Sequence, residues 1–146
     1  MLVNIVANNG NLLLGVPPRG DGRIDDEARR IVQKIGEWMR VNGEAIHATR
    51  PWKQSKEGEL RFTRSKNGEN LYAISLSWPT DGKLVVSNTA LGNTPVAEVT
   101  LLGHAGTLTW RQTESHLEIT LPPRPPCEFA YAFRIRGRDR TAFADV

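Results

Sequence analysis

The stretch NNGNLLLGVPP, residues 8–18, decides how the fold of this chain is interpreted. Two prolines close a nearly unbroken apolar run, which consists of Leu12, Leu13, Leu14 and Val16. A strand with one face in water alternates apolar and polar residues, whereas a strand covered on both faces does not. The run therefore predicts a strand buried on both faces, of the kind found in parallel sheets that are flanked by helices.

An amphipathic helix is expected directly after this strand. Asp25, Asp26 and Glu27 crowd its start, where carboxylates suit the free amides and the positive end of the helix dipole. Apolar residues at helical spacing then form one stripe, namely Ala28, Ile31, Val32, Ile35, Trp38 and Met39. Asn42-Gly43 is expected to end the helix, with the glycine in the left-handed cap conformation. Because residues 1–7 suggest only the tail of an earlier helix, residues 1–43 amount to half of a repeating β–α unit.

From about Leu60 onward the apolar pattern has a period of two. Tyr72 and Ile74 alternate with Ala73 and Ser75, and further alternating stretches follow at residues 83–86, 97–101, 107–111, 117–121 and 129–136. Short alternating strands separated by turn signals predict an antiparallel β-sandwich or barrel. We therefore interpret residues 44–59 as a linker and residues 60–146 as a mainly β, sandwich-type domain.

Composition and charge exclude several classes of protein. The formal net charge is +3, and the one basic cluster, Arg134, Arg136, Arg138 and Arg140, is typical of a solvated charged face, so no nucleic-acid partner is expected. No apolar run approaches the roughly 20 residues that span a bilayer, so no membrane partner is expected either. The first residues do not form a signal peptide, so a soluble protein of unknown compartment is expected. One cysteine, Cys127, excludes an internal disulfide framework and a multi-cysteine metal site.

Two longer stretches carry a family resemblance. NGNLLLGVPPRGDGRI (residues 9–24) and IGEWMRVNGEAIHATRPW (residues 35–52) resemble the C-terminal part of α-L-fucosidases of glycoside hydrolase family 29. LYAISLSWP, VAEVTLLG, LTWRQ and YAFRIRG also resemble sandwich strands of that family. The resemblance implies a β/α barrel followed by a β-sandwich. Leu12–Val16 would then be a lone barrel strand, and residues 26–42 the helix that packs outside it.

The resemblance also implies where the chemistry lies. Family members are retaining enzymes with an aspartate nucleophile and a second carboxylate as acid and base, and both lie upstream of this chain. No catalytic residue, metal or cofactor is therefore expected here. The densest acidic group, residues 21–27, is interpreted as helix capping and a solvated loop. Gly15 stands where the family has asparagine, which removes a polar side chain near the barrel mouth and puts in doubt any substrate contact from this turn.

Other candidate sites are weak. His47, His104 and His116 lack metal-ligand spacing, and the same scatter argues against a catalytic triad. Sugar-binding modules stack sugar rings on exposed aromatic side chains, but three of the four tryptophans, Trp38, Trp78 and Trp110, occupy apolar faces and are expected in the core. Only Trp52 escapes a periodic pattern. It is the one candidate substrate-binding residue, with a plug between helix and sandwich as its alternative role.

These observations predict the C-terminal segment of an α-L-fucosidase, with a structural role and no activity alone. Its expected partners are the catalytic barrel domain and, through the parent enzyme, a fucosylated glycan. Residues 12–16 lack barrel neighbours, so we expect them to pair with a sandwich edge or with another copy of the chain. A free-standing carbohydrate-binding module is the alternative function, followed by a basic nucleic-acid-binding domain.

Overall fold

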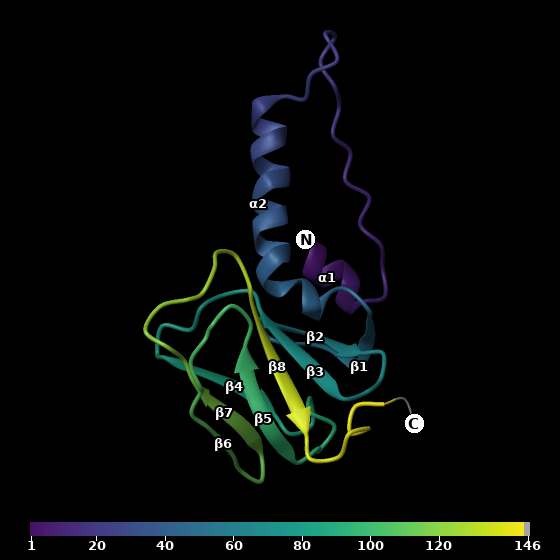
Figure 1. Ribbon diagram of the computed structural model, residues 1–146. Helices are drawn as coiled ribbons and strands as arrows, with labels where there is room; N and C mark the ends of the chain where they lie inside the picture. The colour runs from purple at the N-terminus through teal and green to yellow at the C-terminus, as the bar shows by residue number, and fades with distance from the viewer. Residues whose placement is uncertain (145–146) are drawn as a thin grey trace.

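The computed structural model describes residues 1–144 and contains a β-sandwich with helices at one end (Figure 1). The helices are α1 (Leu2–Ala7), α2 (Asp26–Asn42) and the short 3₁₀ helix η1 (Gly43–Ala45). The strands are β1 (Thr49–Glu57), β2 (Leu60–Ser65), β3 (Asn70–Ser75), β4 (Lys83–Ser87), β5 (Val96–Leu101), β6 (Trp110–Gln112), β7 (His116–Thr120) and β8 (Tyr131–Gly137). Both predicted helical segments, residues 1–7 and 26–42, are confirmed.

Two antiparallel sheets form the sandwich. One has the strand order β1-β2-β3-β8-β5 and the other β4-β7-β6. Their inner faces share one apolar core, whose largest fully buried side chains include Phe62, Phe133, Leu71, Ile135 and Leu117. The expectation of a mainly β, antiparallel sandwich preceded by a helical unit is therefore confirmed.

A second, smaller core lies on the outer face of the five-stranded sheet. Val3 of α1, Trp38 of α2 and Ala45 of η1 pack there against Tyr72, Ile74, Ala130 and Ala132. β3 and β8 consequently have apolar neighbours on both faces: Leu71 and Ala73 point into the sandwich, while Tyr72 and Ile74 point towards the helices. The helices thus cover one end of this sheet face.

Residues 44–59 differ from the expected linker. They include most of η1 and the whole of strand β1, which pairs with β2 at the edge of the sheet. The strand escaped the sequence pattern because its register shifts between Pro51 and Lys56, which breaks the alternation of apolar and polar residues. Pro51 is compatible with this position, since an edge strand has one side without ladder hydrogen bonds.

α2 ends at Asn42 as expected, but the conformation of the next residue, Gly43, differs from expectation. Gly43 has a φ of −58°, in the right-handed region, and the chain continues directly into η1. A side chain at Gly43 would meet the ring of His47, because an added Cβ would lie 3.3 Å from His47 Cδ2. Glycine is therefore explained here by close approach rather than by a left-handed cap.

Residues 12–16 form no strand, and their expected pairing with a sandwich edge is wrong. They run in extended form beside α2, where residues 8–24 make a long excursion from the body (Figure 1). The nearest bridge joins Pro18 and Ile24, at the tip of that excursion. Leu13 is 96% exposed and Leu14 is 41% exposed. The sandwich edges lie elsewhere, so this segment finds no partner strand among the described residues.

Within residues 1–144, no helix has the length and apolar character that crossing a membrane would require.

Candidate functional site

An apolar groove lies between α1, α2 and the loop that leads into β8. Its volume is about 650 Å³. Its wall includes Leu12, Ile31, Ile35, Trp38, Leu76 and Phe129, with the cationic side chains of Arg30 and Lys34 beside them. The amphipathic pattern of α2 creates one wall, because its apolar stripe is longer than the part that the sheet covers.

Exposed apolar side chains are concentrated around this groove. Of the eight large hydrophobic residues that are exposed in residues 1–144, only Val85 lies on the sandwich away from the helices, on β4. The other seven line the groove, lie in the excursion or, for Val32, lie on α2: Met1, Leu13, Leu14, Ile24, Ile31, Val32 and Phe129. A cluster of this kind marks an interaction surface far more often than isolated exposed residues do.

The C-terminal end of α2 is fixed to the start of β8 by buried hydrogen bonds. The Trp38 indole Nε1 donates to the carbonyl of Ala130 at 2.8 Å. Asn42, which is fully buried, accepts from the Ala132 amide at 3.2 Å through Oδ1 and donates to the Trp38 carbonyl at 3.3 Å. Loss of either side chain would leave buried backbone groups without partners, which is costly. The helix and the sandwich are therefore joined by specific polar contacts as well as by apolar packing.

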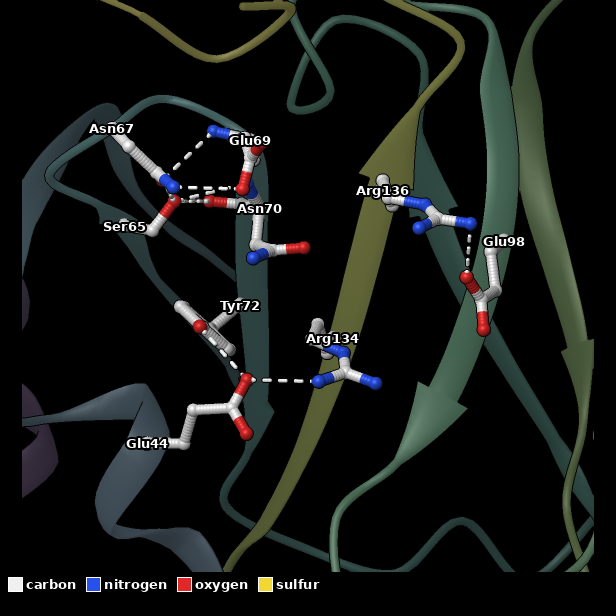
Figure 2. Close-up of polar contacts among 9 residues, drawn as sticks. All are labelled: Glu44, Ser65, Asn67, Glu69, Asn70, Tyr72, Glu98, Arg134 and Arg136. Carbon is white, nitrogen blue, oxygen red and sulfur yellow. Dashed lines mark hydrogen bonds and ion pairs between the residues drawn. The ribbon is translucent and has the colours of Figure 1, made fainter. Parts of the chain in front are cut away.

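A polar cluster occupies the uncovered end of the same sheet face (Figure 2). Glu44 Oε1 accepts from the Tyr72 hydroxyl at 3.0 Å and from Arg134 Nη1 at 3.2 Å. Burial raises the pKa of Tyr72, and the neighbouring Glu44 carboxylate raises it further because a phenolate would be repelled. These contacts connect η1 with β3 and β8.

The basic cluster of β8 is partly neutralised on this face. Arg134 pairs with Glu44, and Arg136 pairs with Glu98 at 2.6 Å (Figure 2). The remaining labelled residues hold the turn between β2 and β3: Asn67 Nδ2 donates to Glu69 at 2.7 Å, and the Asn70 amide donates to Ser65 Oγ at 3.0 Å. Two of the four arginines thus form ion pairs within the chain, which favours the interpretation of this cluster as a solvated charged face.

The candidate substrate contact Trp52 lies inside the sandwich. Its side chain is 7% exposed, and its Nε1 donates to the Ala90 carbonyl at 2.7 Å. Its ring meets Phe143 edge-on, with the centroids 5.6 Å apart, and Lys53 Nζ lies 5.1 Å from the ring centroid. This placement offers no open ring face to a sugar and favours the structural role. Trp38 is buried as expected, and Trp78 and Trp110 are half-buried against the core.

The other residues considered from the sequence do not come together as a site. Within residues 1–144, no group of three or more potential metal-ligating side chains forms. Asp25 caps α2 by accepting from the Glu27 amide at 3.0 Å, and Asp21 accepts from the Arg23 amide. Cys127 is half-buried, and burial raises the pKa of its thiol, which disfavours the nucleophilic thiolate.

Phe129 is the residue of the groove that sequence reasoning missed. The alternating pattern of residues 129–136 placed it in a strand with an inward side chain, but β8 begins only at Tyr131. Phe129 has a φ of 75° and is 64% exposed. Alternation cannot reveal this, because a single residue in the left-handed region redirects the chain without changing the apolar pattern.

Comparison with known proteins accounts for both halves of the chain. Residues 53–136 match the family model for the alpha-L-fucosidase C-terminal domain, and residues 1–44 match the model for alpha-L-fucosidase. The alpha-L-fucosidase of Branchiostoma floridae is 34% identical over 145 residues, a match that covers 94% of this chain and 31% of that protein. The human tissue alpha-L-fucosidase is 34% identical over 142 residues, covering 93% of this chain and 30% of that protein.

A solved structure agrees with these matches. Alpha-L-fucosidase isoenzyme 1 from Paenibacillus thiaminolyticus superposes with a TM-score of 0.80 at 26% identity, over 94% of this chain and 33% of that one. The chain thus spans about a third of the length of the relatives that it matches. It belongs to the α-L-fucosidase family and corresponds to the C-terminal part of its members, including their C-terminal domain.

Proposed function

We propose that this chain is the C-terminal sandwich part of an α-L-fucosidase whose catalytic part hydrolyses terminal α-linked fucose from glycans. One observation carries the proposal. Residues 1–44, which match the α-L-fucosidase model, form α1, α2 and an extended apolar segment, and these leave a groove open. Such a surface is expected where a larger β/α unit has its last strand and helix. The chain itself then has a structural role.

The contacts of α2 suggest how the sandwich serves catalysis. Trp38 and Asn42 fix this helix to β8, so the sandwich holds one outer helix of the proposed barrel in place. Active sites of such barrels are built at the C-terminal ends of the strands, and misplacement by about 1 Å can reduce the rate about 100-fold. A rigid support for the last helix therefore contributes to positioning without touching substrate.

The placement of the acidic side chains supports the proposal that the isolated chain has no glycosidase activity. Retaining glycosidases use two carboxyl groups about 5 Å apart in a cleft. The densest acidic group of this chain lies at the start of α2 and in the preceding loop, where Asp25 caps the helix and Asp21 binds a backbone amide. These carboxylates serve local structure, and the groove beside α2 is lined by apolar and cationic side chains.

An activity assay tests the proposal. The purified chain is incubated with an aryl α-L-fucoside, beside a longer form that carries the catalytic segment found in the relatives. We expect no turnover by the chain and clear turnover by the longer form. Turnover by the chain alone would contradict the structural role, and a longer form that leaves the fucoside intact would contradict the fucosidase assignment.

Two further partner predictions belong to the same proposal. The buried Trp52 does not favour a free-standing carbohydrate-binding module, so titration with fucose-containing oligosaccharides should leave the tryptophan fluorescence unchanged. The isolated chain should self-associate through residues 12–16, because Leu13 and Leu14 are exposed and no strand pairs with the segment among the described residues. Light scattering that finds a monomer at all concentrations would contradict the second prediction.

A further inference from the structure

Strand β4 lies at one end of the three-stranded sheet and has an open edge. It pairs with β7 on one side, and within residues 1–144 no strand pairs with its other side. Just before β4, the Gly82 carbonyl accepts from the Leu121 amide, so position 82 faces β7. Bonded positions alternate along an antiparallel pair. Three residues of β4 therefore point their backbone groups towards the open edge: Lys83, Val85 and Ser87.

Carboxylates already occupy two of these three outward amides. The Lys83 amide donates to Asp81 Oδ1 at 3.2 Å, within the turn that leads into β4. The Ser87 amide donates to Glu57 Oε1 at 3.0 Å, and the Ser87 hydroxyl donates to Glu57 Oε2. Glu57 is the last residue of β1, the edge strand of the other sheet, so its side chain crosses from one sheet to the other. Only the Val85 amide is left without an acceptor among residues 1–144.

An edge of this composition attracts other strands when it is left open. β4 has the sequence KLVVS, and the side chain of Val85 is 49% exposed. Unpaired edges with apolar, β-branched residues add strands from other chains unless charges or bulges prevent it. An added strand must place its carbonyl oxygens opposite the outward amides of β4. The Glu57 carboxylate accepts hydrogen bonds only, so it takes the Ser87 amide and repels an approaching carbonyl.

The opposite end of the sandwich is crossed in a related way. There β5 and β6 are the edge strands of the two sheets. Gln112, the last residue of β6, accepts from the Val96 amide of β5 at 2.8 Å and donates to the Thr94 carbonyl at 2.9 Å. An amide side chain serves one donor and one acceptor, whereas the carboxylate of Glu57 serves the two donors of Ser87. Each crossing side chain thus matches the groups that it meets.

We propose that Glu57 guards the edge of β4. By holding the Ser87 amide, its carboxylate prevents β4 of a second copy of this chain from pairing with β4. A second copy fits this edge because two identical edges can pair about a two-fold axis at Val85, which would bring the exposed valines together. This role concerns the sandwich alone, so it is independent of the proposed function.

Hydrogen exchange in the unaltered chain tests the guard first. At micromolar concentration, the Ser87 amide should be protected about tenfold more than the Val85 amide. Tenfold corresponds to about 1.4 kcal/mol, near the low end for a hydrogen bond to a charged group. Exchange of the Val85 amide should not depend on protein concentration. Equal protection of the two amides, or protection of Val85 that rises with concentration, would overturn the proposal.

A pair of alanine variants tests the role of the carboxylate. Glu57→Ala should lower the protection of the Ser87 amide about tenfold at micromolar concentration. At millimolar concentration its Val85 amide should exchange about fivefold more slowly than at micromolar concentration, since pairing with a second copy adds a hydrogen bond worth about 1 kcal/mol. Glu59→Ala is the matched control, because it removes the same charge from an exposed position of the same hairpin and should change neither amide.

A double variant separates guarding from a merely structural contact. Adding Val85→Lys to Glu57→Ala should abolish the concentration dependence at position 85, because a charged side chain on an edge strand opposes strand addition. Association through residues 12–16 would not move this readout, which is local to β4. The proposal would be overturned if Glu57→Ala showed no concentration dependence, if Glu59→Ala showed the same one, or if the double variant retained it. If Glu57→Ala does not fold, the measurement on the unaltered chain still decides.

Discussion

Two apolar segments of this chain look alike in sequence and have opposite fates in the structure. Leu12–Val16 is a nearly continuous apolar run, yet Leu13 is 96% exposed and no strand within residues 1–144 pairs with the segment. The sequence of β3 has the alternating pattern of a half-buried strand, yet its residues from Leu71 to Ser75 are buried on both faces. The comparison shows that a strand is buried on both faces only where other elements pack on both faces, whatever its own apolar pattern. β3 has the sandwich core on one side and the helices on the other, whereas Leu13 and Leu14 remain exposed.

The largest expected difference between the two regions is in the free energy of unfolding after truncation of an apolar side chain. Phe133→Ala, in the strand beside β3, should reduce the free energy of unfolding by about 3–5 kcal/mol, because its ring is fully buried. Leu13→Ala should change it by less than about 0.5 kcal/mol in the isolated chain. Urea unfolding followed by tryptophan fluorescence measures both. A Leu13 variant that loses as much stability as the Phe133 variant would show that residues 12–16 are packed after all.

The next effect concerns the junction between α2 and the sandwich. Asn42→Ala should reduce the free energy of unfolding by about 1–3 kcal/mol, because the buried Ala132 amide loses its acceptor. Hydrogen exchange at Ala132 should accelerate at the same time. Asn11→Ala, in the exposed segment, is the control and should change neither quantity. If exchange at Ala132 is unaffected in the Asn42 variant, the hydrogen bond does not join the two parts.

Tyr72, in the polar cluster on β3, predicts a loss of stability at alkaline pH. The pKa of Tyr72 is raised from its ordinary value of 10.0, so the folded state favours the neutral phenol and the unfolded state releases the proton first. The stability from this group is fully present below pH 10.0 and is lost as the pH rises towards the higher folded-state pKa. Tyr72→Phe should therefore flatten the loss of stability above pH 10.0. Urea midpoints measured across this range check it, and an unchanged slope would contradict the assignment.

The smallest expected change in the free energy of unfolding concerns the exposed ion pair between Glu98 and Arg136. Glu98→Gln removes the ion pair with Arg136. The Glu98 side chain is 44% exposed and the Arg136 side chain is 56% exposed. Water screens such pairs, so the free energy of unfolding should fall by less than about 1 kcal/mol. A loss as large as that of Asn42→Ala would mean that the charged pair, and not the buried amide, stabilises this side of the sheet.

The sequence was sufficient for those parts of the fold that depend on local pattern. The helical stripe of α2 and the alternation at residues 117–121 predicted their elements, because one side of each faces a core. β1 escaped because a register shift interrupts its alternation. The end of α2 at Asn42 was predicted, but the right-handed conformation of Gly43 was not, because close approach of His47 rather than a left-handed cap explains this glycine. Neither the apolar groove nor the exposure of Phe129 was predicted, because the groove depends on the path of residues 8–24 and Phe129 on a backbone turn that no pattern encodes.

Hydrogen exchange at residues 12–16 tests the central claim most directly. The backbone hydrogen bonds that flank this segment involve the amides of Gly10 and Arg19, so its own amides should exchange at nearly the rate of an unfolded chain in dilute residues 1–146. In the longer form with the catalytic segment they should become as protected as those of β3, since a neighbouring strand then accepts them. Amides that remain unprotected in the longer form would contradict the account, and so would amides already protected in the isolated monomer.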